Sequence, residues 1–201
     1  MSPRPRKVSD EEVFAAAYRA MQRLGPGELT LAEIAAEAGV TAGALAQRFG
    51  SKRALLLALS KGAAAAAGEL VRGMHAAHRS PLGAVRAYAE CLAGLASSPA
   101  ALARNLAYLQ IDLADPDFRA QLAAQGRATR EALRALLEEA VAVGELARGT
   151  DTRALAGTLE VALNGAVLTW AFYQEGMAAR FLRNAVDAVL APYRPKKRVR
   201  A

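Results

Sequence analysis

The sequence predicts an all-α fold of about nine helices, in which a small N-terminal helix-turn-helix domain precedes a larger C-terminal helical domain. Three observations support this prediction. The 201 residues are 53% apolar, and much of that fraction is alanine, the strongest helix former. Runs of the β-branched and aromatic residues that favour strands are almost absent. Residues that start and stop helices recur at intervals of about one helix length, with short connections between them.

Helix starts and stops divide the chain into its predicted elements. Capping boxes mark the first two helices, through Ser9 with Glu12 and Thr30 with Glu33. Later helices begin at a cap residue followed by proline, whose missing N–H is harmless there: Ser80-Pro81, Ser98-Pro99 and Asp115-Pro116. Glycines mark expected helix ends: Gly25, Gly39, Gly50, Gly144 and Gly176. The predicted helices cover residues 10–24, 31–38, 42–48, 52–76, 81–96, 99–113, 116–143, 152–174 and 178–190.

The segment Thr30–Leu56 has the pattern of a helix-turn-helix unit. Its turn contains Gly39, which can adopt the conformation that a tight turn requires. Each of the first three helices carries an apolar stripe, and the stripes can close a small core of Phe14, Ala17, Met21, Leu24, Leu31, Ile34, Ala35, Ala38, Leu45 and Phe49. We therefore expect a three-helix domain over residues 8–56, with the motif at about residues 31–50.

Three kinds of side chain in this unit are suited to DNA. Small residues would let the third helix lie deep in the major groove, two long side chains can pair with bases or phosphates, and groups at helix N-termini favour phosphates. The predicted DNA-binding residues are Thr30, Thr41, Ala42, Gly43, Gln47, Arg48 and Lys52. Among them, Gln47 suits adenine and Arg48 suits guanine or a phosphate. The pattern alone also occurs in domains that bind proteins or only pack.

The same segment resembles the TetR family of transcriptional regulators. The matching positions are Thr30–Glu33, Ile34-Ala35, Ala38-Gly39-Val40, Gly43, Leu45, Phe49, Ser51-Lys52 and Leu55-Leu56, followed downstream by Gly144-Glu145-Leu146, Asp151 and an apolar helix ending near Trp170. The resemblance implies a homodimer that binds a double-stranded DNA operator and a small-molecule effector. It fails at Ala46, where the family usually has a tyrosine that contacts phosphate. One phosphate contact is therefore expected to be missing.

The resemblance also implies that residues 57–190 combine ligand binding with dimerisation. The last two predicted helices carry more apolar surface than one small bundle needs. The predicted dimer contacts are Leu155, Leu159, Leu163, Ala166, Phe181, Leu182, Val186 and Val189. A twofold dimer would place two recognition helices about one DNA turn apart, on a near-palindromic operator. Ordinary core packing is the alternative explanation of these stripes.

A mainly apolar ligand pocket is expected within the same domain. Its predicted lining is Leu106, Tyr108, Leu109, Leu113, Phe118, Asn164, Trp170 and Tyr173. No cluster of lysine or arginine lies among these residues, which favours a mainly apolar effector without a strong acid. Asn164 could orient the ligand or bond a neighbouring helix.

The net charge of +7 is concentrated near the two ends of the chain. The basic residues there are Arg4, Arg6, Lys7, Arg194, Lys196, Lys197, Arg198 and Arg200. Basic arms beside a DNA-binding unit can neutralise phosphates, although solvated ends are the alternative. Residues 191–201 are predicted to be a basic disordered tail.

Other function classes find little support in the sequence. It has no nucleophile–base pair, phosphate-binding loop or metal cluster, so we expect no enzyme activity, no cofactor and no metal. His75 and His78 are expected at a solvated helix end, and Cys91 in the apolar core. The N-terminus lacks the apolar segment of a signal peptide, and the uncharged stretch 161–174 is shorter than the about 20 residues that span a bilayer. We expect a cytoplasmic protein with no membrane partner.

The favoured function is a ligand-responsive DNA-binding transcriptional regulator, most of all a repressor that binds its operator as a dimer. The effector would shift the fourth helix, which begins at Lys52, and so spoil the spacing of the two recognition helices. The alternative is a helical ligand-sensing or protein-interaction module without sequence-specific DNA binding.

Overall fold

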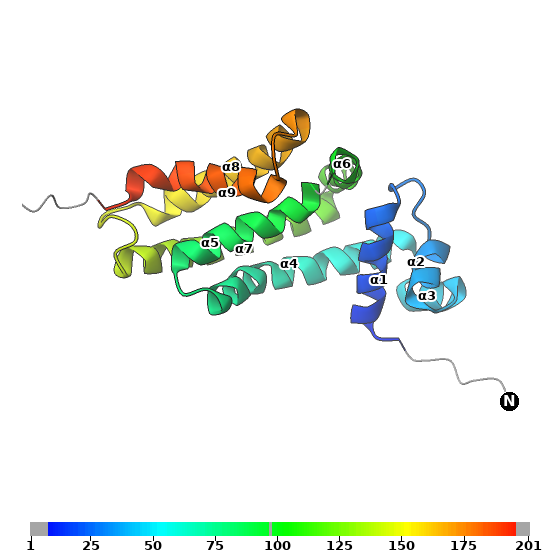
Figure 1. The fold of residues 1–201 in the computed structure, drawn as a ribbon. Coiled ribbons are helices and arrows are strands. Elements are labelled where there is room, and N and C mark those ends of the chain that lie inside the picture. The colour runs from blue at the N-terminus through cyan, green and yellow to red at the C-terminus, as the bar shows by residue number, and fades with distance from the viewer. Residues whose placement is uncertain (1–7, 97, 196–201) are drawn as a thin grey trace, which may run out of the picture. The chain divides into compact units, whose positions relative to one another are not determined.

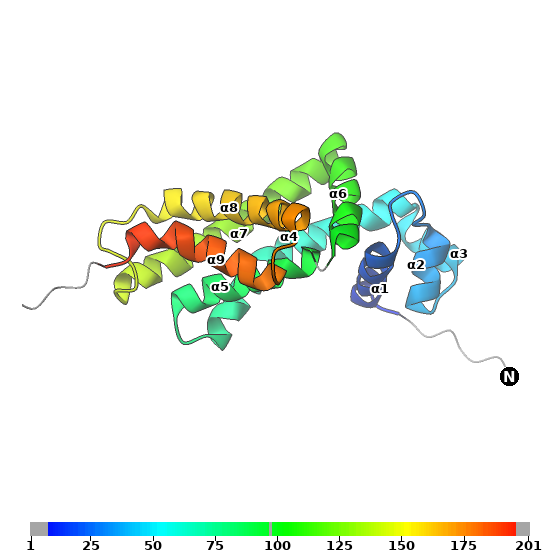
Figure 2. The same ribbon diagram turned by 45° about the horizontal axis from the view of Figure 1, so that its top comes forward.

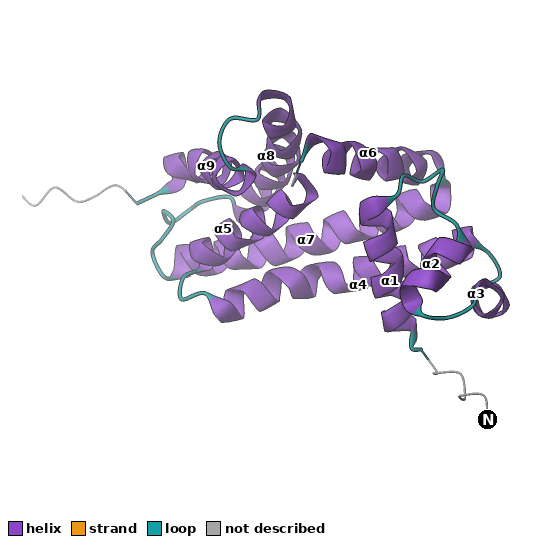
Figure 3. Ribbon diagram, turned by 45° about the vertical axis from the view of Figure 1, so that its right-hand side comes forward, coloured by secondary structure: helices purple, strands orange, loops and turns teal. Residues whose placement is uncertain are grey.

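The computed structural model describes residues 8–96 and 98–195, and within them it confirms the all-helical prediction, with no strand (Figure 3). The elements are α1 (Asp10–Arg23), α2 (Leu31–Ala38), α3 (Ala42–Phe49), α4 (Lys52–Ala77), α5 (Pro81–Leu92), η1 (Ala93–Ala96), α6 (Pro99–Ala114), α7 (Pro116–Ala142), α8 (Thr152–Tyr173), α9 (Ala178–Leu190) and η2 (Ala191–Tyr193). The fifth predicted helix, residues 81–96, is thus α-helical only to Leu92 and continues as the 3-10 helix η1.

The chain divides into two compact units. The first unit combines residues up to Ala63 with Ala103–Leu122, and the second combines Ala64–Leu102 with the residues from Ala123 onward. Helices α4, α6 and α7 therefore each contribute residues to both units. The N-terminal domain predicted over residues 8–56 lacks the segment Ala103–Leu122.

The first unit packs α1 against α2 and α2 against α3 (Figure 1). The capping box at Ser9 is complete, since Ser9 N–H donates to Glu12 (2.8 Å) and Glu12 N–H donates to the Ser9 hydroxyl (3.2 Å). Gly39 ends α2 in the left-handed conformation, at φ 69°. Most of the predicted small core forms and gains residues from other elements, but Phe14 and Ala38 are only half-buried and lie outside it. The buried members of this core are Val8, Val13, Ala17, Ala20, Leu29, Ile34, Ala35, Leu45, Leu55 and Tyr108.

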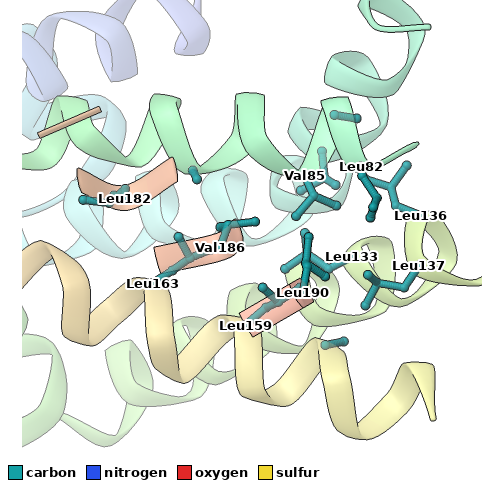
Figure 4. Close-up of a cluster of buried hydrophobic side chains, with 14 of the residues drawn as sticks. Leu82, Val85, Leu133, Leu136, Leu137, Leu159, Leu163, Leu182, Val186 and Leu190 are labelled. Carbon is teal, nitrogen blue, oxygen red and sulfur yellow. The ribbon is translucent and has the colours of Figure 1, made fainter. Parts of the chain in front are cut away.

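The second unit has a larger apolar core. Helix α9 lies beside α8 and α5 (Figure 2). Figure 4 shows side chains from four helices meeting there: Leu82 and Val85 of α5, Leu133, Leu136 and Leu137 of α7, Leu159 and Leu163 of α8, and Leu182, Val186 and Leu190 of α9. Truncating one such leucine to alanine typically costs about 2–5 kcal/mol of stability.

Two expectations about single residues of the second unit need correction or addition. The core prediction for Cys91 is wrong, because its side chain is exposed. The buried stripe of α5 runs through Leu82, Val85 and Ala89, and Cys91 lies two residues beyond this stripe, away from the core. His78 is exposed as expected, whereas the Nε2 atom of His75 lies 3.0 Å from the Glu139 carboxylate.

Helices α4 and α8 are both long and apolar enough to cross a membrane, judged by length and composition alone. Core helices of soluble proteins meet the same criterion, and α8 supplies seven buried residues to the second unit. The expectation that the chain has no membrane partner stays a prediction.

Candidate functional site

Helix α3 presents one face to the core and leaves the other exposed. Leu45 is its buried anchor, and Phe49 packs near Phe14 with ring centroids 6.0 Å apart. Of the predicted DNA-binding residues on α3, Gly43 and Gln47 are exposed and Ala42 is half-buried. Among the described residues, no hydrogen bond engages the Gln47 side chain. The outward face of α3 therefore carries small residues at its start and a polar side chain near its end.

The threonines before α2 and α3 cap these helices. The Thr30 hydroxyl accepts the N–H of Glu33, and the Thr41 hydroxyl accepts the N–H of Ala44, each at 3.1 Å. Both threonines are exposed. A hydroxyl that accepts a bond from its own helix still has its proton to donate, so both remain suited to a phosphate oxygen.

Arg48 makes contacts that its sequence position does not suggest. Its Nη1 donates to the Val8 carbonyl at 2.7 Å, and its guanidinium pairs with Asp10 and lies 5.5 Å from the centre of the Phe49 ring. The side chain therefore joins the end of α3 to the start of α1. A contact with DNA would have to replace or extend these bonds.

Lys52 closes the loop between α1 and α2. Its ammonium donates to the carbonyls of Leu29 (2.7 Å) and Pro26 (3.2 Å). The side chain is half-buried, so these bonds hold it in place at the start of α4. The charge predicted to meet a phosphate thus also stabilises the loop.

An ion-pair cluster joins the start of α4 to the junction of α6 and α7. Arg53 donates to Asp115 through two bonds of 2.9 Å and to Asp117 through one of 2.7 Å, and it lies 5.6 Å from the centre of the Phe118 ring. The hydrogen bonds that Arg53 donates to Asp117 and Asp115 raise the pKa of Arg53. Burial works against ionisation of Asp115, but the bond from Arg53 holds its pKa below the usual value. We call Arg53, Asp115 and Asp117 the junction cluster.

Two further side chains of α6 bind the end of α1. The Tyr108 hydroxyl donates to the Leu24 carbonyl at 2.9 Å, and Arg104 Nε donates to the Gln22 carbonyl at 3.0 Å. Burial raises the pKa of Tyr108 to about 12. These bonds, with the junction cluster, tie residues 103–122 to the end of α1 and the start of α4.

The first unit also contains a cavity of about 200 Å³. Residues of α1, α4, α6 and α7, with Pro26 of the loop after α1 and Asp115 between α6 and α7, line it: Met21, Pro26, Lys52, Arg53, Leu56, Leu59, Ser60, Tyr108, Ile111, Asp112, Asp115 and Phe118. Two of the predicted pocket residues, Tyr108 and Phe118, are among them. Leu106 and Leu113 are exposed and Leu109 is half-buried.

The other three predicted pocket residues belong to the second unit. Trp170 is buried in its core and donates from Nε1 to the Gly176 carbonyl at 3.1 Å, whereas Asn164 and Tyr173 are exposed. The predicted lining is thus divided between two units. Sequence reasoning missed Arg53, Asp112 and the pairing role of Asp115; only the charges beside the Asp115-Pro116 cap could have indicated them.

Most of the predicted dimer residues make contacts within the chain. Leu155, Leu159, Leu163, Ala166, Leu182 and Val186 are buried in the core of the second unit, and Phe181 and Val189 are half-buried against it. The opposite face of α8 exposes a different stripe, in which Val161, Leu168 and Phe172 are 73%, 36% and 75% exposed. Gly165 lies between Val161 and Leu168 on the same face, and we call these four residues the α8 stripe.

Comparison with known proteins gives two family matches. Residues 13–59 match the model of bacterial regulatory proteins of the tetR family, and residues 83–186 match that of the tetracyclin repressor-like C-terminal domain. No curated protein sequence matches the chain.

Solved structures share the fold over nearly the whole chain. SmeT, the repressor of the Stenotrophomonas maltophilia multidrug efflux pump SmeDEF, has 23% identity and a TM-score of 0.66, with 97% of this chain and 94% of that chain covered. The regulator SCO0520 of Streptomyces coelicolor has 26% identity and a TM-score of 0.68, covering 94% and 99%. Thermus thermophilus FadR, a repressor in complex with lauroyl-CoA, has 24% identity and a TM-score of 0.59, covering 96% and 99%.

Proposed function

Since this chain belongs to the TetR family of DNA-binding transcriptional regulators, we propose that it is a homodimeric repressor released from its operator by a small molecule. The family consists of regulators and not of enzymes, and its members are typically ligand-responsive repressors. A protein of this kind acts where the DNA is, so we place it in the cytoplasm.

The main observation that supports the exposed face of α3 as the DNA-contacting surface is the glycine at position 43. A Cβ added there would meet only the Thr41 hydroxyl, at 3.9 Å, and the backbone does not have a positive φ. Nothing within the protein therefore requires glycine, which costs a helix about 0.5–1 kcal/mol relative to alanine. Gly62 has the same open space, but only Gly43 lies on the exposed face of α3, the second helix of the helix-turn-helix unit, where a close approach to DNA accounts for it. Thr30, Thr41, Ala42, Gln47, Arg48 and Lys52 are the proposed contacts around it.

The α8 stripe supports the proposed dimer. Large apolar side chains this exposed are uncommon on a monomer when they form one continuous patch. Val161, Gly165, Leu168 and Phe172 follow a spacing of three to four residues, so they lie on one face of α8. A second copy of this helix would bury them across a twofold axis, and Gly165 would allow a close approach. This stripe replaces the buried leucines as the proposed contact.

The proposed effector is small and mainly apolar. SmeT and FadR are both repressors, and the FadR structure contains lauroyl-CoA, which supports ligand-responsive repression here. Helices α4, α6 and α7 each contribute residues to both units, so a ligand that displaces one of these helices would also disturb the junction cluster at their ends. Release would follow when the shifted α4 changes the spacing of the two recognition helices.

A matched pair of glycine substitutions tests the proposed DNA surface. Gly43→Leu and Gly62→Leu both add a side chain at a helical glycine with open space inside the protein. We expect both variants to fold with unchanged or higher stability, because leucine favours helix. Binding to a duplex selected from random DNA should fall at least about tenfold for Gly43→Leu alone, measured by fluorescence anisotropy. Equal affinities of the two variants would contradict the assignment of α3.

A further inference from the structure

The cavity in the first unit has mainly apolar walls and room for one small molecule. Its volume is about 200 Å³, and Met21, Leu56, Leu59, Ile111 and Phe118 supply the apolar lining. A cavity of about 150 Å³ accommodates benzene in a well-studied engineered case. The space therefore suits one aromatic ring with a short chain attached.

Charged side chains also line the cavity, and most are already engaged. Lys52 donates to two backbone carbonyls, and Arg53 is paired with Asp115. Asp112 on α6 is different, since among the described residues no hydrogen bond or ion pair engages its carboxylate. It is half-buried, and burial, followed by the negative charge of Asp115, raises its pKa. A nearby cation would stabilise the ionised form of this carboxylate, which burial and the charge of Asp115 disfavour.

We infer that this cavity binds a small amphipathic cation, with the ammonium beside Asp112 and the apolar body against Leu56, Leu59 and Phe118. The ligand would supply a positive charge beside Asp112 and would cover the apolar lining of the cavity. A carboxylate ligand would meet Asp112, while the two cations of the lining, Lys52 and Arg53, are already held by the Leu29 carbonyl and by Asp115, so such a ligand is disfavoured. The inference gives the proposed effector a chemical class, and only its regulatory consequence rests on the proposed function.

A bound cation would also touch the junction cluster. Arg53 and Asp115 line the same cavity and tie the start of α4 to the α6–α7 junction. An ammonium near these groups would compete with Arg53 for the carboxylates. Occupancy would then loosen the start of α4, directly behind the recognition helix.

Three probes of similar shape test the charge requirement in the full chain without DNA. Phenethylamine is an ammonium at pH 7, 2-phenylethanol is neutral and phenylacetate is an anion. By calorimetric titration we expect the amine to bind once per chain, about tenfold or more tighter than the alcohol, with phenylacetate weakest.

Variants locate the binding. Asp112→Asn should lower the affinity for phenethylamine about tenfold or more and leave the affinity for 2-phenylethanol unchanged. The variant should fold normally, because the substitution removes no hydrogen bond or ion pair of the described residues. Ile111→Trp, which narrows the cavity, should weaken both. Glu175→Gln removes an exposed charge of the second unit and should change neither.

The outcomes separate the site from its regulatory role. Equal affinity for all three probes would overturn the assignment of this site. So would a loss of phenethylamine affinity in Glu175→Gln as large as the loss in Asp112→Asn. Asp112-dependent binding of the amine that leaves operator affinity unchanged would establish the site and refute its role in release. Asp112-dependent binding that lowers operator affinity supports both.

Discussion

At the scale of single residues, polar side chains of the first unit hold loops and helix ends together. Lys52 and Arg48 were predicted from the sequence as contacts to phosphate or bases, but in the structure they donate to the carbonyls of Leu29 and Val8. The sequence shows that Lys52 follows the cap residue Ser51 and that Arg48 lies in the last turn of its helix. It does not show which distant carbonyl lies within reach, because that depends on the path of the loop.

Tyr108 gives a prediction with a spectroscopic signal. Its pKa is raised to about 12 by burial, while its hydroxyl donates to Leu24. Because an unfolded tyrosine ionises near 10, the contribution of Tyr108 to stability should be complete below about pH 10 and lost as pH rises towards 12. Ultraviolet titration of the five tyrosines should show a late component near 12.

Tyr108→Phe should remove this late component and lower the unfolding free energy by about 1 kcal/mol. Tyr88→Phe is the control, because burial raises the pKa of Tyr88 as well but its side chain belongs to the second unit. A late component that survives in Tyr108→Phe and disappears in Tyr88→Phe would refute the assignment.

Ala46 gives a second prediction at this scale. It is exposed on α3, where the family usually has a phosphate-binding tyrosine. Ala46→Tyr should restore one hydrogen bond to the DNA backbone and raise affinity about two- to tenfold for specific and nonspecific duplexes alike. Gel-shift titrations measure this, with Ala120→Tyr on the exposed face of α7 as the control. A gain on one sequence only would indicate base contact instead.

At the scale of elements, helix boundaries follow from local chemistry and were largely predictable. Ser9, Thr30 and Thr41 each cap the expected helix, because a cap bonds within three residues of itself. The roles of the faces were harder to predict. Both stripes of α8 are apolar, and the sequence alone could not assign Leu159 to the chain's own core and Phe172 to the surface.

The junction cluster is an element-scale prediction about pH. Asp115 has a lowered pKa through its bond with Arg53, so this pairing stabilises the fold above the usual carboxyl value near 4 and is lost as pH falls through the lowered value. Arg53→Gln should therefore lower the urea midpoint at pH 7, and the difference from the wild type should shrink towards pH 3. Arg127→Gln, an exposed position outside the cluster, is the control. A pH-independent difference would show that Arg53 acts through packing.

At the scale of the whole molecule, the sequence predicted an N-terminal DNA-binding domain and a larger helical domain, and the family matches agree with both. It did not predict that residues 103–122 join the first unit. That association depends on contacts between positions more than 60 residues apart, such as Arg53 with Asp115 and Tyr108 with Leu24. Local patterns carry no information about such pairs. The same limit explains why the predicted pocket residues are divided between the units.

The central claim is that two chains, joined through the α8 stripe, bind one operator. Sedimentation equilibrium of the protein with a selected operator duplex measures the mass of the complex directly. We predict two chains per duplex for the wild type and for Val143→Glu, which adds a charge at an exposed position outside the stripe. Phe172→Glu should sediment as a monomer and form no complex at the same concentration. A complex of one chain per duplex, or a Phe172→Glu complex identical to that of the wild type, would contradict the claim.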